Sequence, residues 1–268
     1  MGTPTIKDVL VTFFMSEKCY QEFFVNFRLD VYCLKMVLGR VGGFWILFEV
    51  LLAQLLQLLT ILWRGSAEGL SLTAVLLQLY AFSCPVVFAV TRNFPSVAWA
   101  EKFFLMAETA AVILVILRFR GDTLRGVLLL FVHCALVVLL VNYAPVSLIF
   151  KMQDSILPAV VLSKLIQAKA NYCNGHTGQL SRPSLILSLG GALGRAFNYW
   201  NPDNIVENLL HIVLVCVSVV LPIQLHYYRR TKRTRKSKKT WWYCQASLPT
   251  IVMLIFLCFC SMLHDPTM

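Results

Sequence analysis

Polar and ionisable side chains interrupt the long apolar runs of this sequence at a few positions. Six of them are candidate ligand contacts: Glu49, Gln57, Glu108, Asp154, Gln167 and Arg195. Polar groups inside a membrane are costly, so they either pair with one another or line a functional path. The functional interpretation is a polar cavity, with Gln57, Gln167 and Arg195 contacting a phosphate or a sugar. The alternative is interhelical hydrogen bonding, which stabilises membrane helices by only about 0.6 kcal/mol per bond.

Sequence signatures of catalysis are missing from the chain. It has no Gly-x-Ser-x-Gly, no His-Glu-x-x-His and no acidic motif that would hold a metal–phosphate. Most of the nine cysteines lie in apolar runs, where Cys behaves as a small hydrophobic residue. These observations predict a non-enzymatic protein without cofactor, metal site or disulfide framework.

Composition identifies the surroundings in which these side chains lie. Of the 268 residues, 58% are hydrophobic and only 14% are charged, whereas a soluble domain has about 25% charged residues. The net charge is +11, and the basic run at 229–239 accounts for much of it. Beside an apolar helix, such a run indicates the positive-inside rule or contact with anionic lipids rather than nucleic-acid binding. The sequence therefore predicts an all-α integral membrane protein.

Apolar runs long enough to cross a bilayer follow an amphipathic lead-in at 1–37. We expect seven spans, at 41–63, 70–91, 98–117, 123–141, 146–168, 185–200 and 205–228. A weaker hydrophobic segment at 248–263 is a possible eighth helix. Pro158 lies in the middle of the fifth span beside Asp154, and we interpret it as a hinge, with a fixed kink as the alternative.

An internal repeat appears when the sequence is shifted by 110 residues. Gln57, Gly65, Leu70 and Ser71 then coincide with Gln167, Gly175, Leu180 and Ser181. Both sets run from the end of one span into the start of the next. We expect two parallel three-helix repeats, at 38–117 and 146–228, joined by a linking helix in 118–145. A basic tail at 229–241 and a hydrophobic extension at 242–268 follow. Positive residues near the span ends favour a lumenal N-terminus and a cytosolic basic tail.

The two repeat junctions resemble the PQ-loop repeat, and several segments are similar to the mannose-P-dolichol utilization defect 1 protein family. The segments that carry the resemblance are 17–20, 33–35, 66–72, 93–95, 104–106, 120–121, 158–161, 171–172 and 174–181. The resemblance extends from about residue 7 to residue 239. The chain departs from the family pattern at Leu56 and Ile166, which replace the proline before each junction glutamine, and at Glu108 and Ile156.

The resemblance implies a multi-pass protein of the endoplasmic reticulum membrane. Such proteins are required for dolichol-phosphate-mannose and dolichol-phosphate-glucose to serve as donors in N-glycan precursor, glycosylphosphatidylinositol-anchor and related glycosylation. The implied partners are these sugar lipids, membrane lipids and lumenal glycosyltransferases. Two alternatives remain open: a small-solute transporter of the PQ-loop or SWEET type, and a sorting receptor similar to the KDEL receptors.

Overall fold

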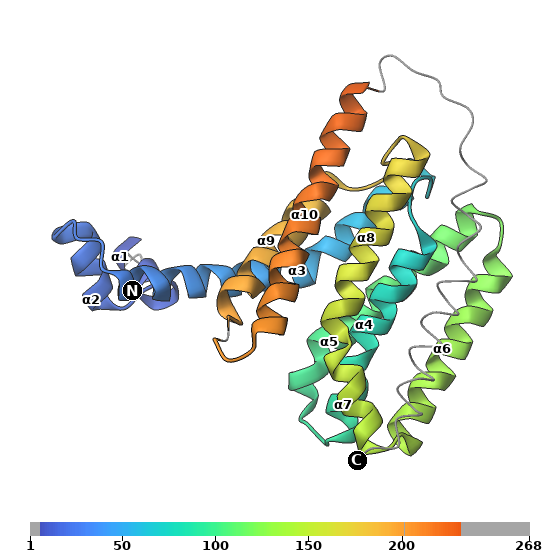
Figure 1. Cartoon of the computed structure of the whole chain (residues 1–268), viewed down its shortest axis with the longest axis horizontal. Helices are drawn as coiled ribbons and strands as arrows, with labels where there is room; N and C mark the ends of the chain where they lie inside the picture. The colour runs from blue at the N-terminus through green and yellow to red at the C-terminus, as the bar shows by residue number, and fades with distance from the viewer. Residues whose placement is uncertain (1–5, 201, 232–268) are drawn as a thin grey trace, which may run out of the picture.

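The computed structural model describes residues 6–200 and 202–231, and this part of the chain is helical without any strand. Figure 1 shows its elements, of which η1 is a single-turn π-helix. In chain order they are α1 (Ile6–Phe13), α2 (Glu17–Tyr20), η1 (Gln21–Val25), α3 (Val31–Arg64), α4 (Leu72–Thr91), α5 (Ser96–Phe119), α6 (Thr123–Tyr143), α7 (Val146–Asp154), α8 (Ile156–Asn174), α9 (Arg182–Asn198) and α10 (Ile205–Thr231). The expected eighth helix and most of the basic tail lie outside the described residues.

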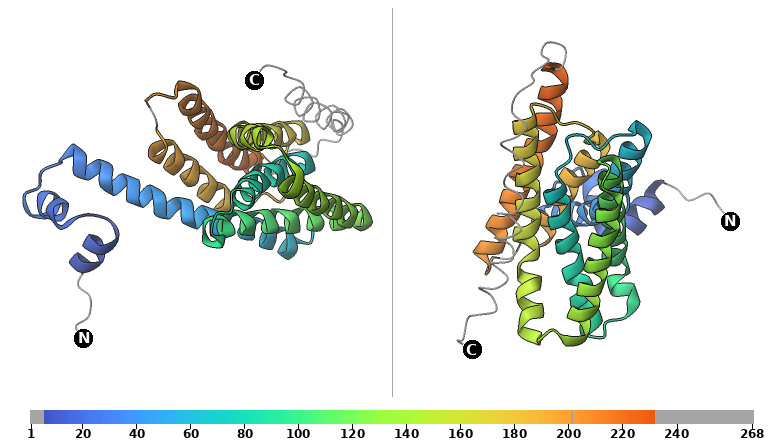
Figure 2. Two further views of the ribbon diagram at one scale, coloured as in Figure 1. Left: turned by 90° about the horizontal axis from the view of Figure 1, so that it is seen from below. Right: turned by 90° about the vertical axis from the view of Figure 1, so that its right-hand side faces the viewer.

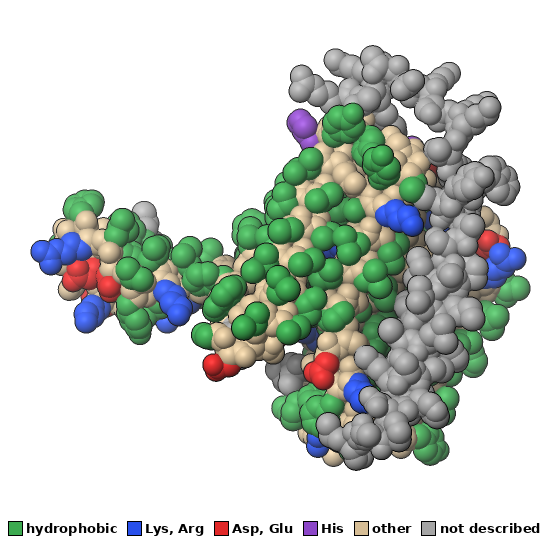
Figure 3. All heavy atoms as spheres, viewed as in Figure 1, with side chains coloured by type: hydrophobic (Ala, Val, Ile, Leu, Met, Phe, Trp, Pro, Cys, Tyr) green, Lys and Arg blue, Asp and Glu red, His purple; other side chains and the backbone are tan. Residues whose placement is uncertain are grey.

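Several of these helices are long and apolar enough to cross a bilayer. Four of them qualify on their own within the described residues: α3, α4, α6 and α10. The pair α7 and α8 makes a fifth if its two parts, bent by 43°, form one span. Hydrophobic side chains also cover most of the visible face of the helical bundle (Figure 3). The chain is therefore a helical membrane protein.

Two expected spans fall outside this set for different reasons. Helix α5 is 24 residues long, but Glu101, Lys102 and Glu108 interrupt its apolar character. Helix α9 has only 17 residues, which is shorter than the roughly 20 needed to cross the hydrocarbon core unaided. Both helices nevertheless pack inside the bundle, α5 against α3 and α4 and α9 against α3 and α10.

The helices pack in the same order in both halves of the chain. In the first half, α5 lies between α3 and α4, and in the second half α10 lies between α8 and α9. The halves meet where α3 packs on α9 and where α4 packs on α7 and α8. Figure 2 shows most of these helices end-on, with α6 beside α4 and α5 at one side. The third helix of each half therefore occupies the position between the other two.

The repeat residues lie at equivalent positions of the two junctions. Gly65 ends α3 and Gly175 ends α8, with φ of 59° and 64° respectively. These left-handed conformations favour glycine, which has no Cβ to clash with the backbone. Ser71 then precedes α4 and its hydroxyl accepts from Ala74 N, while Ser181 precedes α9. The two junctions thus share their helix stops and starts.

The expected continuous fifth span is interrupted at Ser155. Helix α7 ends at Asp154 and α8 begins at Ile156. Pro158 explains the position of this break, because it lacks the N–H that would bond the carbonyl four residues earlier and its ring clashes with that carbonyl. Pro158 therefore lies in the first turn of α8, and the bend lies just before it rather than at its own position.

The N-terminal segment forms an arm that extends away from the bundle along α3 (Figure 1). Two expectations about it are wrong. Helix α3 begins at Val31, within the expected lead-in, because Asp30 accepts from Tyr32 N and caps the helix at that point. A disulfide joins Cys19 to Cys33 and ties α2 to the start of α3. These two cysteines lie in the mixed polar lead-in rather than in the apolar runs.

Candidate functional site

A cavity of about 730 Å³ lies between the two halves of the bundle. Its volume is within the range of small-molecule sites, roughly 300–1,000 Å³. Its lining combines apolar side chains with hydroxyl and charged groups. The apolar lining residues include Val50, Ala53, Ala81, Phe82, Leu157 and Val160, and the polar ones include Glu49, Ser163, Lys164, Ser184, Ser188 and Arg195.

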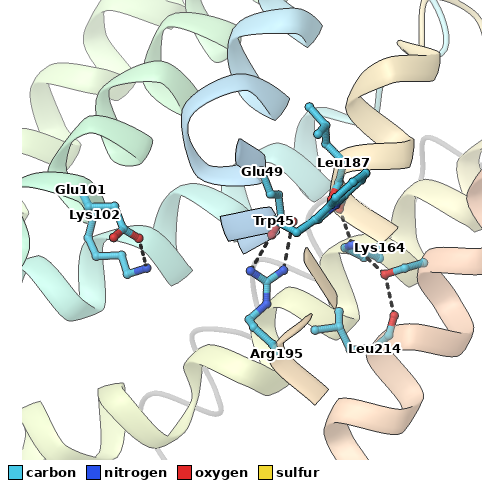
Figure 4. Close-up of polar contacts among 10 residues, drawn as sticks. Trp45, Glu49, Glu101, Lys102, Lys164, Leu187, Arg195 and Leu214 are labelled. Atoms are coloured by element: carbon cyan, nitrogen blue, oxygen red, sulfur yellow. Dashed lines mark hydrogen bonds and ion pairs between the residues drawn. The ribbon is translucent and has the colours of Figure 1, made fainter. Parts of the chain in front are cut away.

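Glu49 and Arg195 form a bidentate ion pair across the contact of α3 with α9. The Arg195 Nη1 atom lies 2.6 Å from Glu49 Oε2 and Nη2 donates to Oε1 at 3.0 Å. The Glu49 side chain is only 12% exposed. Figure 4 shows the guanidinium of Arg195 pointing directly at this carboxylate. Two of the expected ligand contacts are therefore each other's partners.

Glycines on α9 make room for this pair. A Cβ on Gly191 would overlap the Glu49 carboxylate, and one on Gly190 would overlap the Trp45 ring. The Trp45 indole N–H instead donates to the Leu187 carbonyl at 3.2 Å. A Cβ on Gly194 would lie 2.9 Å from the Gly42 carbonyl oxygen. The close approach of α3 and α9 thus depends on small residues, as is usual between membrane helices.

Lys164 lies in the same cavity and is paired with hydroxyl groups only. Its Nζ donates to Ser188 Oγ at 2.6 Å and to Ser218 Oγ at 2.8 Å, and the residue is 6% exposed. Figure 4 shows its ammonium group pointing toward these contacts near Trp45 and the Glu49–Arg195 pair. No carboxylate of the described residues forms an ion pair with it. Lys164 is absent from the sequence-based candidates, although an intramembrane lysine is itself a signal.

Gln57 and Gln167 make reciprocal hydrogen bonds to the opposite junction. Gln57 Nε2 donates to the Gln179 carbonyl at 3.3 Å, and its Oε1 accepts from Ser181 N at 2.9 Å. Gln167 Nε2 donates to the Gly69 carbonyl at 3.0 Å, and its Oε1 accepts from Ser71 N at 2.9 Å. Each partner in the second set lies 110 positions from its counterpart in the first. The internal repeat therefore corresponds to a two-fold pattern of contacts.

These bonds hold the two junction loops together at one end of the cavity. Gln179 N also donates to the Glu68 carbonyl at 2.9 Å, and a Cβ on Gly69 would lie 2.7 Å from the Gly178 Cα. The cavity residues at this end are buried: Gln57, Leu70, Gln167 and Leu180. At the other end the lining includes the exposed residues Tyr199 and Asn204. The cavity is thus closed at the junctions and reaches the surface at the opposite end.

The remaining candidates have different positions. Asp154 lines the cavity and is exposed, close to the bend before Pro158. Glu108, on α5, does not line it. Glu108 is 7% exposed, and neither of its carboxylate oxygens has a hydrogen-bond partner among the described residues. Five of the six expected residues therefore surround one cavity, and Glu108 lies apart from it.

Other polar groups of the bundle have structural partners. His133 on α6 contacts the Ser83 hydroxyl of α4 at 3.1 Å, and Tyr80 shares a 2.8 Å hydrogen bond with Ser155 at the bend. Within the described ranges, no three His, Cys, Asp or Glu side chains gather as a metal site would require. The polar groups that line the cavity are therefore hydroxyl, amide, carboxylate, imidazole, guanidinium and ammonium groups.

Comparison with models of known protein families gave no match, and no solved structure matched the chain. The resemblance to the mannose-P-dolichol utilization defect 1 family accordingly rests on the sequence motifs given above.

Proposed function

We propose that the chain is a non-enzymatic factor of the endoplasmic reticulum membrane that binds dolichol-phosphate-linked sugars and makes them usable as glycosyl donors. The observation that carries this proposal is the cavity, whose lining combines apolar side chains with the buried cation Lys164 and the Arg195 guanidinium. A sugar lipid of this kind has an isoprenoid chain, a phosphate and a polar headgroup. The apolar lining residues suit the chain, while Lys164, Arg195 and the serine hydroxyls suit the phosphate and sugar.

The architecture that we propose is seven spans arranged as 3+1+3. Helices α3, α4 and α5 are the first repeat, α6 is the linking helix, and α7–α8, α9 and α10 are the second repeat. The matching order of packing in the two halves supports it, as do the reciprocal bonds of Gln57 and Gln167. Packing of α5 and α9 within the bundle supports counting them as spans.

We propose a lumenal N-terminus and cytosolic junction loops. Arg64, Lys169 and Arg182 near the junctions support a cytosolic position for that end. In this orientation the cavity opens toward the lumen, where the donors are used.

The experiment that tests the proposed function is the lipid-linked oligosaccharide profile of cells lacking the protein, measured together with the amount of dolichol-phosphate-mannose. We expect truncated intermediates that lack the lumenally added mannoses, in spite of normal donor levels. Re-expression of the wild-type chain restores the full-length precursor. A normal profile in the cells lacking the protein would overturn the proposal.

A small-solute transporter is the second candidate, and the bend between α7 and α8 favours it. A broken helix beside a central cavity is a common device of transporters that alternate between two open states. Solute flux in proteoliposomes separates the two candidates, because a factor that only binds lipid donors produces none.

A further inference from the structure

We propose that Lys164 is the anion-binding group of the cavity and that it selects a singly charged phosphodiester over a phosphomonoester dianion. The inference rests on the proposed function and specifies the chemistry of the same site. Sugar-linked isoprenoid phosphates are phosphodiesters with one negative charge, whereas the sugar-free isoprenoid phosphate is a monoester with a charge of about −1.5 to −2 at neutral pH, as for other phosphomonoesters. The charges around Lys164 provide the argument.

The first step is the depth of Lys164. Its partner Ser218 lies 13 residues into α10, which places it about 20 Å along the helix from the open end at Ile205. Its other partner, Ser188, lies six residues into α9, about 9 Å from the closed end. The ammonium group therefore lies far inside the bundle, where water screens its charge poorly and a counter-charge is most favourable.

The second step is the hydrogen-bonding capacity of the ammonium group. A lysine Nζ has three N–H donors and no acceptor. Two of the three donate to the Ser188 and Ser218 hydroxyls, which leaves one for a ligand. The two hydroxyls fix the direction of the side chain but provide no negative charge. The arrangement is thus oriented and still lacks a counter-ion among the described residues.

The third step is the charge of the interior. Arg195 is neutralised by Glu49, so the group formed by Lys164, Arg195 and Glu49 holds two cations and one carboxylate and has one excess positive charge. The other charged lining residues are Lys102, Asp154 and Glu207, and Asp154 is exposed. Lys102 is paired with Glu101 at 2.7 Å, and Glu207 accepts from the Asn204 amide. A single negative charge completes the balance beside Lys164, and a second one would be buried without a partner.

The test measures binding of three short-chain probes to the purified full chain in lipid nanodiscs. The probes are an isoprenyl phosphoryl mannose, the matching isoprenyl phosphate and the uncharged isoprenyl mannoside. We expect the phosphoryl mannose to bind about tenfold or more tightly than either of the others, since a hydrogen bond to a charged group contributes about 1.5–3 kcal/mol. If the wild-type protein binds the phosphoryl mannose and the neutral mannoside with equal affinity, this result alone overturns the proposal.

Variants then assign the effect to Lys164. Lys164→Met keeps an unbranched side chain but removes the ammonium group, and it should weaken the binding of phosphoryl mannose about tenfold or more while leaving that of the neutral mannoside unchanged. Lys169→Met, at an exposed position of the same helix, is the matched control and should bind as the wild type does. Unchanged binding of phosphoryl mannose to Lys164→Met would exclude Lys164 as the anion site.

Failure of this inference can be told apart from failure of the proposed function. If the phosphodiester binds through Lys164 but cells lacking the protein make a normal glycan precursor, the anion site stands and the cellular role fails. If cells lacking the protein make a truncated precursor, but re-expressed Lys164→Met restores the full-length precursor and binds the phosphoryl mannose normally, the cellular role stands and the Lys164 site fails.

Discussion

Arg195 and Glu49 depend on each other, because each is a charge inside a bundle that water scarcely reaches. Arg195→Met would leave the Glu49 carboxylate without its cationic partner and without the Nη2–H that donates to Oε1. Removing one partner of a buried ion pair costs about 3–5 kcal/mol. We therefore expect a loss of this size in the free energy of unfolding, measured by denaturation of the purified protein in detergent.

The double variant Glu49→Leu/Arg195→Met separates the pair from the rest of the site. Replacing both charges by apolar groups leaves no buried unpaired charge, so it should be more stable than Arg195→Met alone. Arg118→Met, at an exposed position of α5, is the control and should unfold as the wild type does. A double variant as unstable as the single one would show that the pair does not account for the loss.

Residue types predicted part of the site. Glu49, Gln57, Gln167 and Arg195 could be selected because each interrupts an apolar run, and all four line the cavity. The pairing of these residues could not be predicted from the sequence, since Glu49 and Arg195 are 146 positions apart and meet only when α3 packs on α9. Lys164 is not among the candidates selected from the sequence, although a charged residue within the expected span 146–168 is itself a signal of function. The pairing of Cys19 with Cys33 could not be predicted, because nothing in the mixed polar sequence around them shows that the two thiols meet.

Close packing of α3 on α9 makes glycine substitutions unequal along these helices. Gly191→Ala would force a methyl group into the Glu49 carboxylate, whereas Gly43 has nothing within 4 Å of its Cβ position. Overpacking costs about 1–3 kcal/mol, and Ala in a helix is favoured over Gly by about 1 kcal/mol. We expect Gly191→Ala to lower the thermal stability and Gly43→Ala to keep or raise it. Equal effects of the two would contradict this description of the helix contact.

Both junction glutamines should contribute to stability, because each makes the same two bonds to the opposite loop; Gln167 also donates to Asn171 Oδ1 at 2.9 Å, so its loss should cost at least as much as that of Gln57. Gln57→Leu or Gln167→Leu leaves a backbone N–H and a carbonyl without their side-chain partners. Each loss should cost about 1–3 kcal/mol. Unfolding of the two single variants, with Gln78→Leu on α4 as a cavity-lining control, measures this. A large effect at one glutamine and none at the other would contradict the two-fold pattern.

Element positions followed from sequence where local signals were strong. Gly65 and Gly175 as helix ends, and Ser71 and Ser181 as starts, could be located from the repeat alone. The start of α3 at Val31 could not, because the Asp30 cap lies among charged residues that were interpreted as a separate lead-in. Pro158 was interpreted as a hinge within one continuous span, with a fixed kink as the alternative, whereas the helix breaks before it, which sequence alone did not show.

The orientation of the whole molecule can be tested by thiol labelling in sealed microsomes, whose outer face is cytosolic. In a chain whose exposed native cysteines are replaced, Glu68→Cys at a junction should react with an impermeant maleimide. Phe94→Cys, between α4 and α5 and 47% exposed, should react only after permeabilisation. The reverse pattern would contradict the proposed orientation, and reaction of both in sealed vesicles would contradict a span in α4.

The measurement that tests the central claim most directly is photo-crosslinking of an isoprenyl phosphoryl mannose with a photoreactive group on its chain, followed by mapping of the modified residues. The account predicts modification of the cavity wall, near Phe82 and Leu157, and its loss when excess unlabelled probe is added. Lipid-facing α6, where Phe131 is 71% exposed, should be modified weakly and without competition. Modification spread over α6 and insensitive to competitor would contradict a sugar-lipid site in the cavity.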